Sequence, residues 1–235
     1  LIHGLIRAED GRKMSKSLGN GIDPMDVIDS HGADALRLFL TSNSAPGQDL
    51  RFSKEKLDAS WNFLNKLWNV SRFVLMNNED FAKNYDLSKL DSSDNFILNE
   101  LNQTITSVNQ NMEKYEFSEV FKILYNFIWN DFAAWYLEIS KINLSKNGSI
   151  EKNNKQYLLN VILEDIIKLL HPFAPFITDE IFSVIKDENI LCSNWPKVKE
   201  IKLDSIKIDN FKVIREAIVG LRNLRAENEI KPSLE

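Results

Sequence analysis

Two lysines and two serines in a glycine-flanked run are the residues of this sequence best suited to chemistry. Residues 11–21 have the sequence GRKMSKSLGNG. Lys13 and Lys16 supply ammonium groups, Ser15 and Ser17 supply hydroxyl groups, and the glycines let the backbone bend. Such a segment can present positive charge and hydrogen-bond donors to a polyphosphate. The sequence therefore predicts a mobile phosphate-handling loop, with Lys16 as the first candidate for catalysis and Lys13 as the second.

The chemistry that suits this loop is stabilisation of a departing pyrophosphate. When a carboxylate attacks the α-phosphorus of ATP, negative charge grows on the pyrophosphate. A lysine that arrives only when a loop closes stabilises that charge more than it stabilises the ground state. On spacing alone, a solvated charged loop without a ligand remains the alternative. A P-loop is excluded, because the G-x-x-x-x-G-K-[ST] spacing and a preceding apolar strand are both missing.

A second group of candidates combines positive charge, amides and one aromatic ring along a predicted helix. This mixture can pair with phosphates, bond to base edges and stack on an unstacked base, which are the contacts that single-stranded RNA requires. For each polar member the alternative is a solvated helix face, and for the aromatic ring it is a core position. The strongest candidates for RNA contact are Arg51, Lys66, Asn69, Arg72 and Phe73, with Lys54, Lys56 and Asn65 beside them.

Composition limits the class of protein. The chain has 235 residues, of which 43% are hydrophobic and 27% charged, enough for one large domain or two small ones. The net charge of −5 argues against RNA binding spread over the whole surface but leaves room for a local site. Cys192 is the single cysteine and there are three histidines, so neither a disulfide nor a Cys/His zinc site is expected, and we predict no metal-binding residues.

No leader peptide and no apolar run near the roughly 18 residues of a membrane span is present in the sequence. We therefore expect a cytoplasmic protein that does not cross a membrane. The chain starts without Met and stops without an obvious ending, so we also expect a piece of a longer protein.

The front of the chain is predicted to be loop, followed by short and then long helices. Residues 4–21 lack helical periodicity. Asp23-Pro24 is a helix start and Gly32 a helix stop, which predicts a short helix up to residue 31 and a second one over residues 33–42. Apolar residues spaced by three and four predict a long helix over residues 53–78, with a buried stripe at Leu57, Trp61, Leu64, Ser71, Leu75 and Trp68.

The remaining sequence predicts a helical bundle. A connecting loop is expected over residues 79–90. Apolar stripes over 97–115 and 117–142 predict two antiparallel helices joined by a tight turn, with Trp129, Phe132, Trp135 and Tyr136 in the core. Further helices are expected over 154–170, from Thr178 onwards, and over 210–229, with an exposed strand or linker at 197–209. His171 is expected to be structural, and Arg215, Arg222 and Arg225 are left without an assigned role. The fold class is all-α, preceded by a loop-rich segment.

The loop resembles a known signature. Residues 13–17, KMSKS, are similar to the signature of the class I aminoacyl-tRNA synthetases, and Leu-Gly-Asn follows as it usually does in that class. The segments that resemble the valyl-tRNA synthetases within it are APGQDLRF at 45–52, NFLNKLWN at 62–69, WNDF at 129–132, HPFAPFITDE at 171–180 and the stretch from Ile214 to Ser233. Essentially the whole chain is covered by the resemblance.

The resemblance implies a role for each part. Residues 1–52 would hold the KMSKS loop and a stem-contact fold, residues 53–210 a helical anticodon-binding domain, and residues 211–235 a helix leading toward a C-terminal coiled coil. Residues 13–17 would bind ATP, which the whole enzyme uses with Mg²⁺ to activate valine before transfer to tRNA(Val). Arg51, Lys66, Asn69, Arg72 and Phe73 would contact the tRNA.

Parts of the family that are missing from this sequence limit what the chain can do alone. The nucleotide-binding sheet, the valine pocket and the editing domain would lie upstream, so this chain is not expected to be catalytic by itself, and the parent is expected to be a monomer. Two alternatives remain: a stand-alone tRNA-binding or scaffold module, and the isoleucine-specific relative. The complete lysine–serine loop favours the ligase.

Overall fold

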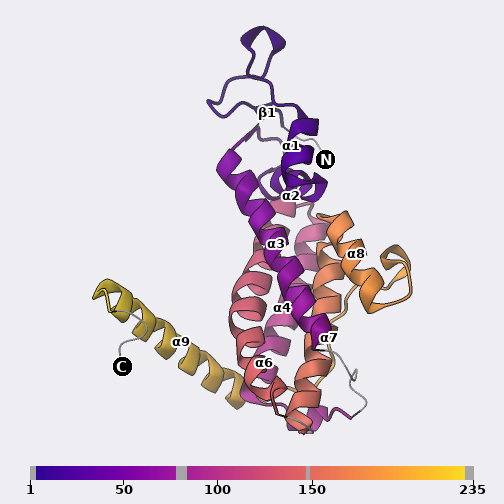
Figure 1. Cartoon of the computed structure of the whole chain (residues 1–235), viewed down its shortest axis with the longest axis vertical. Coiled ribbons are helices and arrows are strands. Elements are labelled where there is room, and N and C mark those ends of the chain that lie inside the picture. Colours follow the sequence, from indigo (N-terminus) through magenta and orange to yellow (C-terminus); the bar gives the residue numbers. More distant parts are fainter. Residues whose placement is uncertain (1–3, 78–83, 147–148, 231–235) are drawn as a thin grey trace.

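A computed structural model describes residues 4–77, 84–146 and 149–230. Residue 78 of the expected long helix and residues 79–83 of the expected connecting loop lie outside the described residues, as does the end of the expected coiled-coil lead at 231–235. Figure 1 shows a bundle of long helices, a loop-rich end above it and a last helix that projects from its lower part. The predicted all-α class with a loop-rich front is confirmed. Among the described helices, none is long and apolar enough to span a bilayer.

The loop-rich end is closed by a very small sheet. Strand β1 (Ile6–Arg7) pairs in parallel with β2 (Leu50–Arg51), so that Ile6 lies opposite Leu50. A 3₁₀ turn, η1 (Lys16–Leu18), lies in the connection. These strands were not predicted from the sequence, because two residues are too few to show an alternating pattern.

Two short helices follow as predicted. In α1 (Pro24–His31) the Asp23 side chain accepts a hydrogen bond from the N–H of Met25 at 2.8 Å, and Gly32 ends the helix with a φ of 84°. Helix α2 (Ala33–Ser42) buries Ala35, Leu38 and Phe39. Local capping signals were sufficient here, because both ends depend on neighbouring residues.

The longest front helix is α3 (Lys54–Met76), with the Ser53 hydroxyl accepting from the N–H of Lys56. Its predicted extent is confirmed, but its predicted stripe is partly wrong. Trp61 and Trp68 are each 44% exposed. Helix α3 packs against α1, α2, α7, α8 and η3, so the buried arc is wider than one stripe and is completed by Phe63, Leu67, Val70 and Val74.

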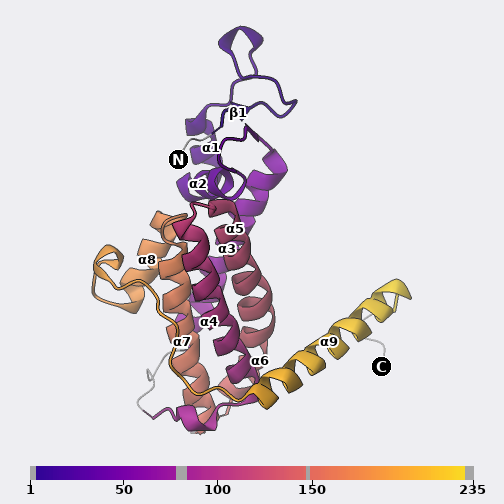
Figure 2. The ribbon, with the colours of Figure 1, turned by 180° about the vertical axis from the view of Figure 1, so that it is seen from behind.

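The predicted antiparallel pair is present. It consists of α4 (Ser92–Glu113) and a continuous rod made of α5 (Phe117–Tyr125), η3 (Asn126–Tyr136) and α6 (Leu137–Leu144). Tyr115, with a φ of 59°, makes the turn between them. The two arms lie side by side when the molecule is seen from behind (Figure 2).

The middle of that rod is a π-helix, which the sequence pattern did not predict. Its backbone N–H groups bond five residues back rather than four, which is rare over more than one turn. Phe132 and Tyr136 are buried as expected. Trp129 and Trp135 are only half-buried, so their assignment to the core was wrong. A π-helix is wider than an α-helix and the indole rings are large, so both rings lie at the edge of the bundle.

Helices α7 (Ile150–Leu170) and α8 (Pro175–Ile185) complete the bundle. Helix α7 starts earlier than expected, because Ser149 caps it by accepting from Lys152 N–H at 3.1 Å. The expected cap at Thr178 was wrong. Pro175 is the first residue of α8, and the buried Thr178 hydroxyl instead donates to the carbonyl of Ala174 at 2.7 Å.

The N-terminus of α8 is capped by a residue from a distant helix. The N–H groups of Phe176 and Ile177 donate to the carboxylate of Asp34 in α2 at 3.3 and 2.7 Å. One turn further along α2, Arg37 donates to the carbonyl of Pro172 at 3.2 Å. The loop-bearing end and the bundle are therefore joined by polar contacts as well as by packing.

The chain leaves the bundle through α9 (Ser205–Glu227), which is capped by Asp204 and begins earlier than the expected residue 210. Residues 193–204 contain no strand, so the linker alternative for the segment before α9 is confirmed. Two short 3₁₀ turns, η2 (Leu87–Lys89) and η4 (Ile190–Cys192), lie elsewhere in the connections. The first turns of α9 pack on α4 through Phe211, whose ring centroid lies 4.7 Å from that of Phe96. The far half of α9 projects away from the bundle (Figures 1 and 2).

A buried ionic network lies between α4, η3 and α7. The ammonium of Lys155, fully buried, lies 2.6 Å from Asp94 Oδ1, 2.9 Å from Asp91 Oδ2 and 2.7 Å from Ser93 Oγ. The Tyr136 hydroxyl donates to Asp94 at 2.8 Å. Burial raises the pKa of Asp94. Burial acts the same way on Asp91, but there the charge of Lys155 prevails and lowers the pKa.

Replacing Lys155 by Met should destabilise the fold strongly. The change leaves Asp94 as a buried carboxylate without its cation, which costs about 3–5 kcal/mol in comparable buried pairs. Without Lys155, the pKa of Asp94 in the folded state rises further above its unfolded value. The loss should therefore be largest at neutral pH and should shrink as the pH falls and folding takes up a proton. Denaturant unfolding followed by circular dichroism at pH 7 and pH 5 measures both effects.

The matched control is Lys122→Met, which breaks an exposed pair with Glu119 on α5. This change should cost about 0–1 kcal/mol at either pH. Equal losses in the two variants would contradict a structural role for the buried network.

Candidate functional site

The lysine–serine loop projects from the end of the molecule beyond β1 (Figure 1). At its base, the N–H of Ala8 donates to the carbonyl of Arg12 at 2.9 Å, and Lys13 forms an antiparallel bridge with Arg7. The N–H of Gly11, at a φ of 85°, donates back to Ala8. A small hairpin over residues 7–13 thus leads from β1 into the lysine–serine loop, which begins at Lys13.

The far side of the loop is held by Asn20. The side-chain oxygen Oδ1 of Asn20 accepts from the N–H of Ser15 at 2.9 Å, and its side-chain nitrogen Nδ2 donates to the carbonyl of Lys13 at 3.2 Å. Gly19 reverses the chain with a φ of 60°. Asn20 was not among the predicted site residues, although the Leu-Gly-Asn that follows the loop marked its position. It fixes the backbone of the very residues that carry the lysines.

The structure brings the five predicted ATP-binding residues together. Lys13, Lys16 and Ser17 are exposed, Met14 and Ser15 are half-buried, and the two serine hydroxyl oxygens lie 3.2 Å apart. Within residues 4–77, 84–146 and 149–230, neither lysine forms an ion pair. Both ammonium groups are therefore available to an anion, on a loop with serine hydroxyls beside them.

Arg51 lies with the loop and not with the other predicted RNA contacts. A Cβ atom added to Gly11 would lie 2.4 Å from Nη2 of Arg51, so the guanidinium packs directly on the loop root. Asp49 supports the same region by accepting from Leu5 N–H at 2.8 Å and from Arg7 Nε at 2.6 Å, and these hydrogen bonds lower its pKa. Asp49 was not predicted from the sequence, since its partners are far away along the chain.

Three predicted contacts, Lys66, Asn69 and Phe73, share a shallow groove between α3 and the rod of η3 and α6. We call it the Phe73 surface; its lining residues are Asn62, Asn65, Lys66, Asn69, Val70, Phe73, Trp129, Leu137 and Lys141. The ammonium of Lys66 lies 3.6 Å from the centroid of the Trp129 ring, and burial lowers its pKa. Amides, two lysines and two aromatic rings thus meet in one place.

Trp129 and Lys141 were missed as members of this surface. Trp129 had been assigned to the core, and Lys141 carries no sequence signal that separates it from other helix lysines. Lys141 pairs with Glu138 at 2.7 Å and lies 5.4 Å from the Phe73 ring. Both come from the far arm of the antiparallel pair, so only the packing of that arm on α3 brings them here.

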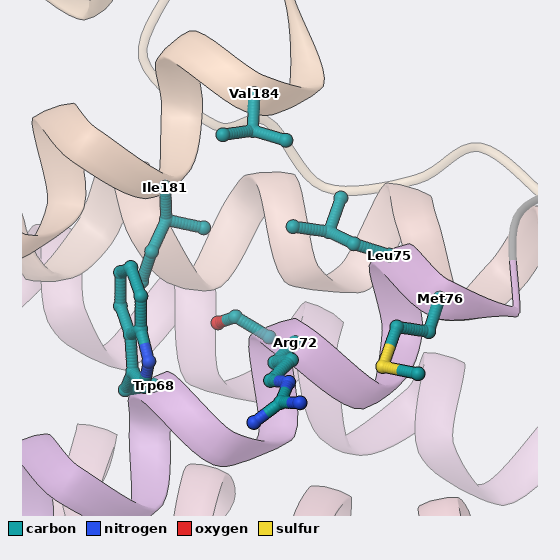
Figure 3. Close-up of a pocket in the computed structure, with 7 residues that line it drawn as sticks. Trp68, Arg72, Leu75, Met76, Ile181 and Val184 are labelled. Carbon is teal, nitrogen blue, oxygen red and sulfur yellow. The ribbon is translucent and has the colours of Figure 1, made fainter.

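Arg72 lies on the other flank of α3, apart from the Phe73 surface. It borders a groove between α3 and α8 that we call the Trp68 groove (Figure 3). The lining residues are Trp68, Ser71, Arg72, Leu75, Met76, Ile181 and Val184. The five predicted RNA contacts therefore occupy three places: the loop root, the Phe73 surface and the Trp68 groove.

The arginines of α9 have structural partners. Arg215 donates to the buried carboxylate of Asp131 at 2.6 Å, and burial raises the pKa of that carboxyl. The guanidinium groups of Arg215 and Arg222 lie 5.4 and 5.3 Å from the Trp135 ring. These contacts hold the root of α9 against the π-helix. His171 is likewise committed, with its Nδ1 2.7 Å from the Thr178 hydroxyl.

Comparison with known proteins places both parts of the chain. Residues 1–53 match the family described as "tRNA synthetases class I (I, L, M and V)", and residues 94–235 match "Anticodon-binding domain of tRNA ligase". Over 231 residues the chain is 50% identical to the valine–tRNA ligases of Bacillus thuringiensis subsp. konkukian and Bacillus anthracis. That of Streptococcus mutans is 47% identical over 242 residues.

The matches cover most of this chain but only part of each relative. The alignment to the Bacillus thuringiensis protein includes 97% of the chain and 26% of the relative. The chain thus spans about a quarter of the length of the curated relatives it matches.

Two solved structures share the fold. A ternary complex of Agrobacterium radiobacter K84 LeuRS with tRNA and LeuAMS has a TM-score of 0.63 at 23% identity, covering 86% of this chain and 24% of that one. Mycobacterium tuberculosis methionyl-tRNA synthetase with methionyl-adenylate has a TM-score of 0.66 at 20% identity, covering 77% and 36%. A bundle with a loop-rich front is therefore a shared architecture. The chain belongs to the family described as the anticodon-binding domain of tRNA ligase, and its first 53 residues match the class I tRNA synthetase family.

Proposed function

We propose that this chain is part of a valine–tRNA ligase, which activates valine with ATP and Mg²⁺ and transfers it to tRNA(Val). The observation that carries the proposal is the 50% identity to valine–tRNA ligases over 97% of the chain, with the lysine–serine loop complete. Within that enzyme the chain supplies the loop that meets nucleotide phosphates and the helices that seat the anticodon region. The remaining three quarters of the relatives' length would supply the other parts of the site.

The loop stabilises negative charge during valine activation. ATP supplies pyrophosphate as the leaving group, and Mg²⁺ neutralises part of its charge. Lys13 and Lys16 carry exposed ammonium groups, and Ser15 and Ser17 offer hydroxyl donors beside them, which fits a polyphosphate. Because the loop stands on a narrow root, it can close over a nucleotide held by another domain and open again. The hydrogen bonds of Asn20 to the backbone of Lys13 and Ser15 keep the loop backbone in one conformation during that motion.

The bundle holds RNA through the Phe73 surface. The half-buried ring of Phe73 offers a platform for an unstacked base, and the amide of Asn69 can bond to a base edge. Lys66 and Lys141 bring positive charge to the same groove, which suits the phosphates of a loop of single-stranded RNA. Arg51, at the root of the lysine loop, would contact tRNA closer to the acceptor end.

The proposed domain boundaries are those expected from the sequence. We propose residues 1–52 as the loop and stem-contact part, 53–210 as the anticodon-binding domain and 211–235 as the lead toward a coiled coil. We further propose that the intact enzyme is a cytoplasmic monomer, which sedimentation of the purified enzyme would test.

Changing both loop lysines to alanine in the intact ligase should slow valine activation. Removal of one preorganised donor to developing charge costs about 10²- to 10³-fold in rate, and the double change Lys13→Ala, Lys16→Ala should lose at least that much. Valine-dependent ATP–pyrophosphate exchange measures the step directly. Parallel assays with isoleucine and with tRNA(Ile) test the amino-acid specificity.

The control is Lys114→Ala, which removes an exposed lysine at the end of α4, far along the chain from the loop. This variant should keep full exchange activity. Unimpaired charging in the double-lysine variant would contradict the assignment of the loop, whatever the tRNA-binding result.

Changing Phe73 to Leu should weaken tRNA binding while leaving pyrophosphate exchange intact. Stacking of one base on an aromatic ring is worth about 1–3 kcal/mol. Lys66→Met should lower the affinity more evenly and reduce the slope of log affinity against log salt by about 0.7, as expected for one lost phosphate contact to a single strand. Nitrocellulose filter binding of tRNA(Val) at several salt concentrations measures both quantities.

Tyr115→Leu is the matched aromatic control, because Tyr115 is exposed in the turn between α4 and α5 and is outside the Phe73 surface. Its tRNA affinity should equal that of the unmodified enzyme. A Phe73→Leu enzyme with unchanged affinity would place the anticodon contact elsewhere.

A further inference from the structure

The Trp68 groove has features of a ligand site that the proposed function leaves unused. Ile181 and Val184 of α8 face Trp68 and Leu75 of α3 across it (Figure 3). Its volume of about 320 Å³ falls at the lower end of the range for small-ligand pockets. The groove therefore has room for one planar group.

One polar atom in the groove wall has no partner. Ser71 is 1% exposed, and its Oγ makes no hydrogen bond within the described chain. Leaving a buried hydroxyl unpaired is unfavourable, and such groups in native proteins are few. Since Ser71 lines a groove that is otherwise almost entirely apolar, a ligand whose polar edge bonds to this hydroxyl would remove the penalty.

The two ends of the groove differ in chemistry. At one end Trp68 presents an indole ring that is 44% exposed, which is a stacking platform. At the rim lies Arg72, which is exposed and forms no ion pair among the described residues. A suitable ligand is flat, has a polar edge that reaches the Ser71 hydroxyl, and carries a negative charge that can pair with the Arg72 guanidinium.

A single nucleotide has this combination, and an apolar side chain does not. An apolar side chain would leave both the Ser71 hydroxyl and the Arg72 guanidinium without partners. The position of the groove also favours RNA, because Lys66, Asn69 and Phe73 lie on the opposite flank of the same helix. An RNA loop that crosses α3 can contact both flanks.

We propose that the Trp68 groove takes one unstacked base of the bound tRNA's anticodon loop, which stacks on Trp68, bonds through its edge to the Ser71 hydroxyl and places its phosphate at Arg72. The inference rests on the proposed function, because it requires tRNA to lie along α3. It adds a second base-binding position, separate from the Phe73 surface. The mostly apolar walls make the position tolerant of base identity, and Ser71 is its one selective contact.

The test uses the intact ligase and tRNA(Val) that carries 2-aminopurine at one anticodon-loop position at a time. Stacking on an indole quenches 2-aminopurine fluorescence, so one position should be quenched on binding and released in Trp68→Leu. The same variant should bind this tRNA about 5- to 150-fold more weakly, the loss expected for one stacked base. Trp61→Leu is the matched control, because Trp61 lies on the same helix with the same 44% exposure but outside both grooves.

Two further variants test the polar contacts without removing apolar volume. Ser71→Ala should weaken binding of the responsive tRNA by about 2- to 10-fold through loss of one hydrogen bond. Arg72→Gln should reduce the salt slope by about 0.7. Unfolding midpoints equal to that of the unmodified enzyme show that each variant is folded.

Each other result has a definite meaning. If Trp68→Leu and Trp61→Leu behave alike at every 2-aminopurine position while Phe73→Leu weakens binding, the groove proposal is wrong and the proposed function stands. If acrylamide fails to reach Trp68 in the tRNA-free ligase, another part of the enzyme fills the groove and the proposal is wrong. If none of these variants, Phe73→Leu included, changes tRNA affinity, tRNA does not lie along α3, and both the Phe73 assignment and the groove proposal are wrong.

Discussion

The carboxylate of Asp34 makes the contact on which the arrangement of the two parts of the molecule depends. A helix N-terminus leaves backbone N–H groups without partners inside the helix, and Ala174, the residue before α8, has no side chain that could accept them. Asp34 accepts two of them from across the interface, where its negative charge also faces the positive end of the α8 dipole. Asp34 is itself buried, so water cannot substitute for it.

This contact places the phosphate loop relative to the RNA surfaces. Helix α2 follows directly from the loop-rich end, and it packs on α3, α5 and α8 of the bundle. Arg37 adds a second polar link from α2 to the turn before α8. The Asp34 contact is part-buried and the Arg37 contact is exposed, and together with the packing of α2 they position the root of the loop over the bundle.

The sequence was a good guide wherever the cause of a structure is local. Helices α1, α2 and α3 end where their own capping residues predict, and the loop was recognised because its residues are consecutive. Contacts between distant segments were not predictable. The prediction that Thr178 caps α8 was wrong because the cap comes from Asp34, which is far away along the chain. The π-helix over 126–136 was not predicted because its apolar residues are spaced much as in an α-helix. The candidate RNA contacts divided among three places, since a list of polar residues does not tell which flank of α3 each one occupies.

Helix α9 projects from the bundle beyond its root, where Arg222 still contacts the Trp135 ring, and this makes it a lever. Its root is pinned by Lys207, which donates to the carbonyl of Leu90 at 2.6 Å, and by Arg215 with Asp131. Beyond Arg215, residues 216–227 extend about 18 Å at the helical rise of about 1.5 Å per residue. By that geometry a tilt of about 10° at the root would move the tip by about 3 Å. The direction of any segment that follows α9 in the intact enzyme therefore depends on a few side chains on the π-helix and α4. A small change in the angle of α9 at its root would move that segment by a larger distance.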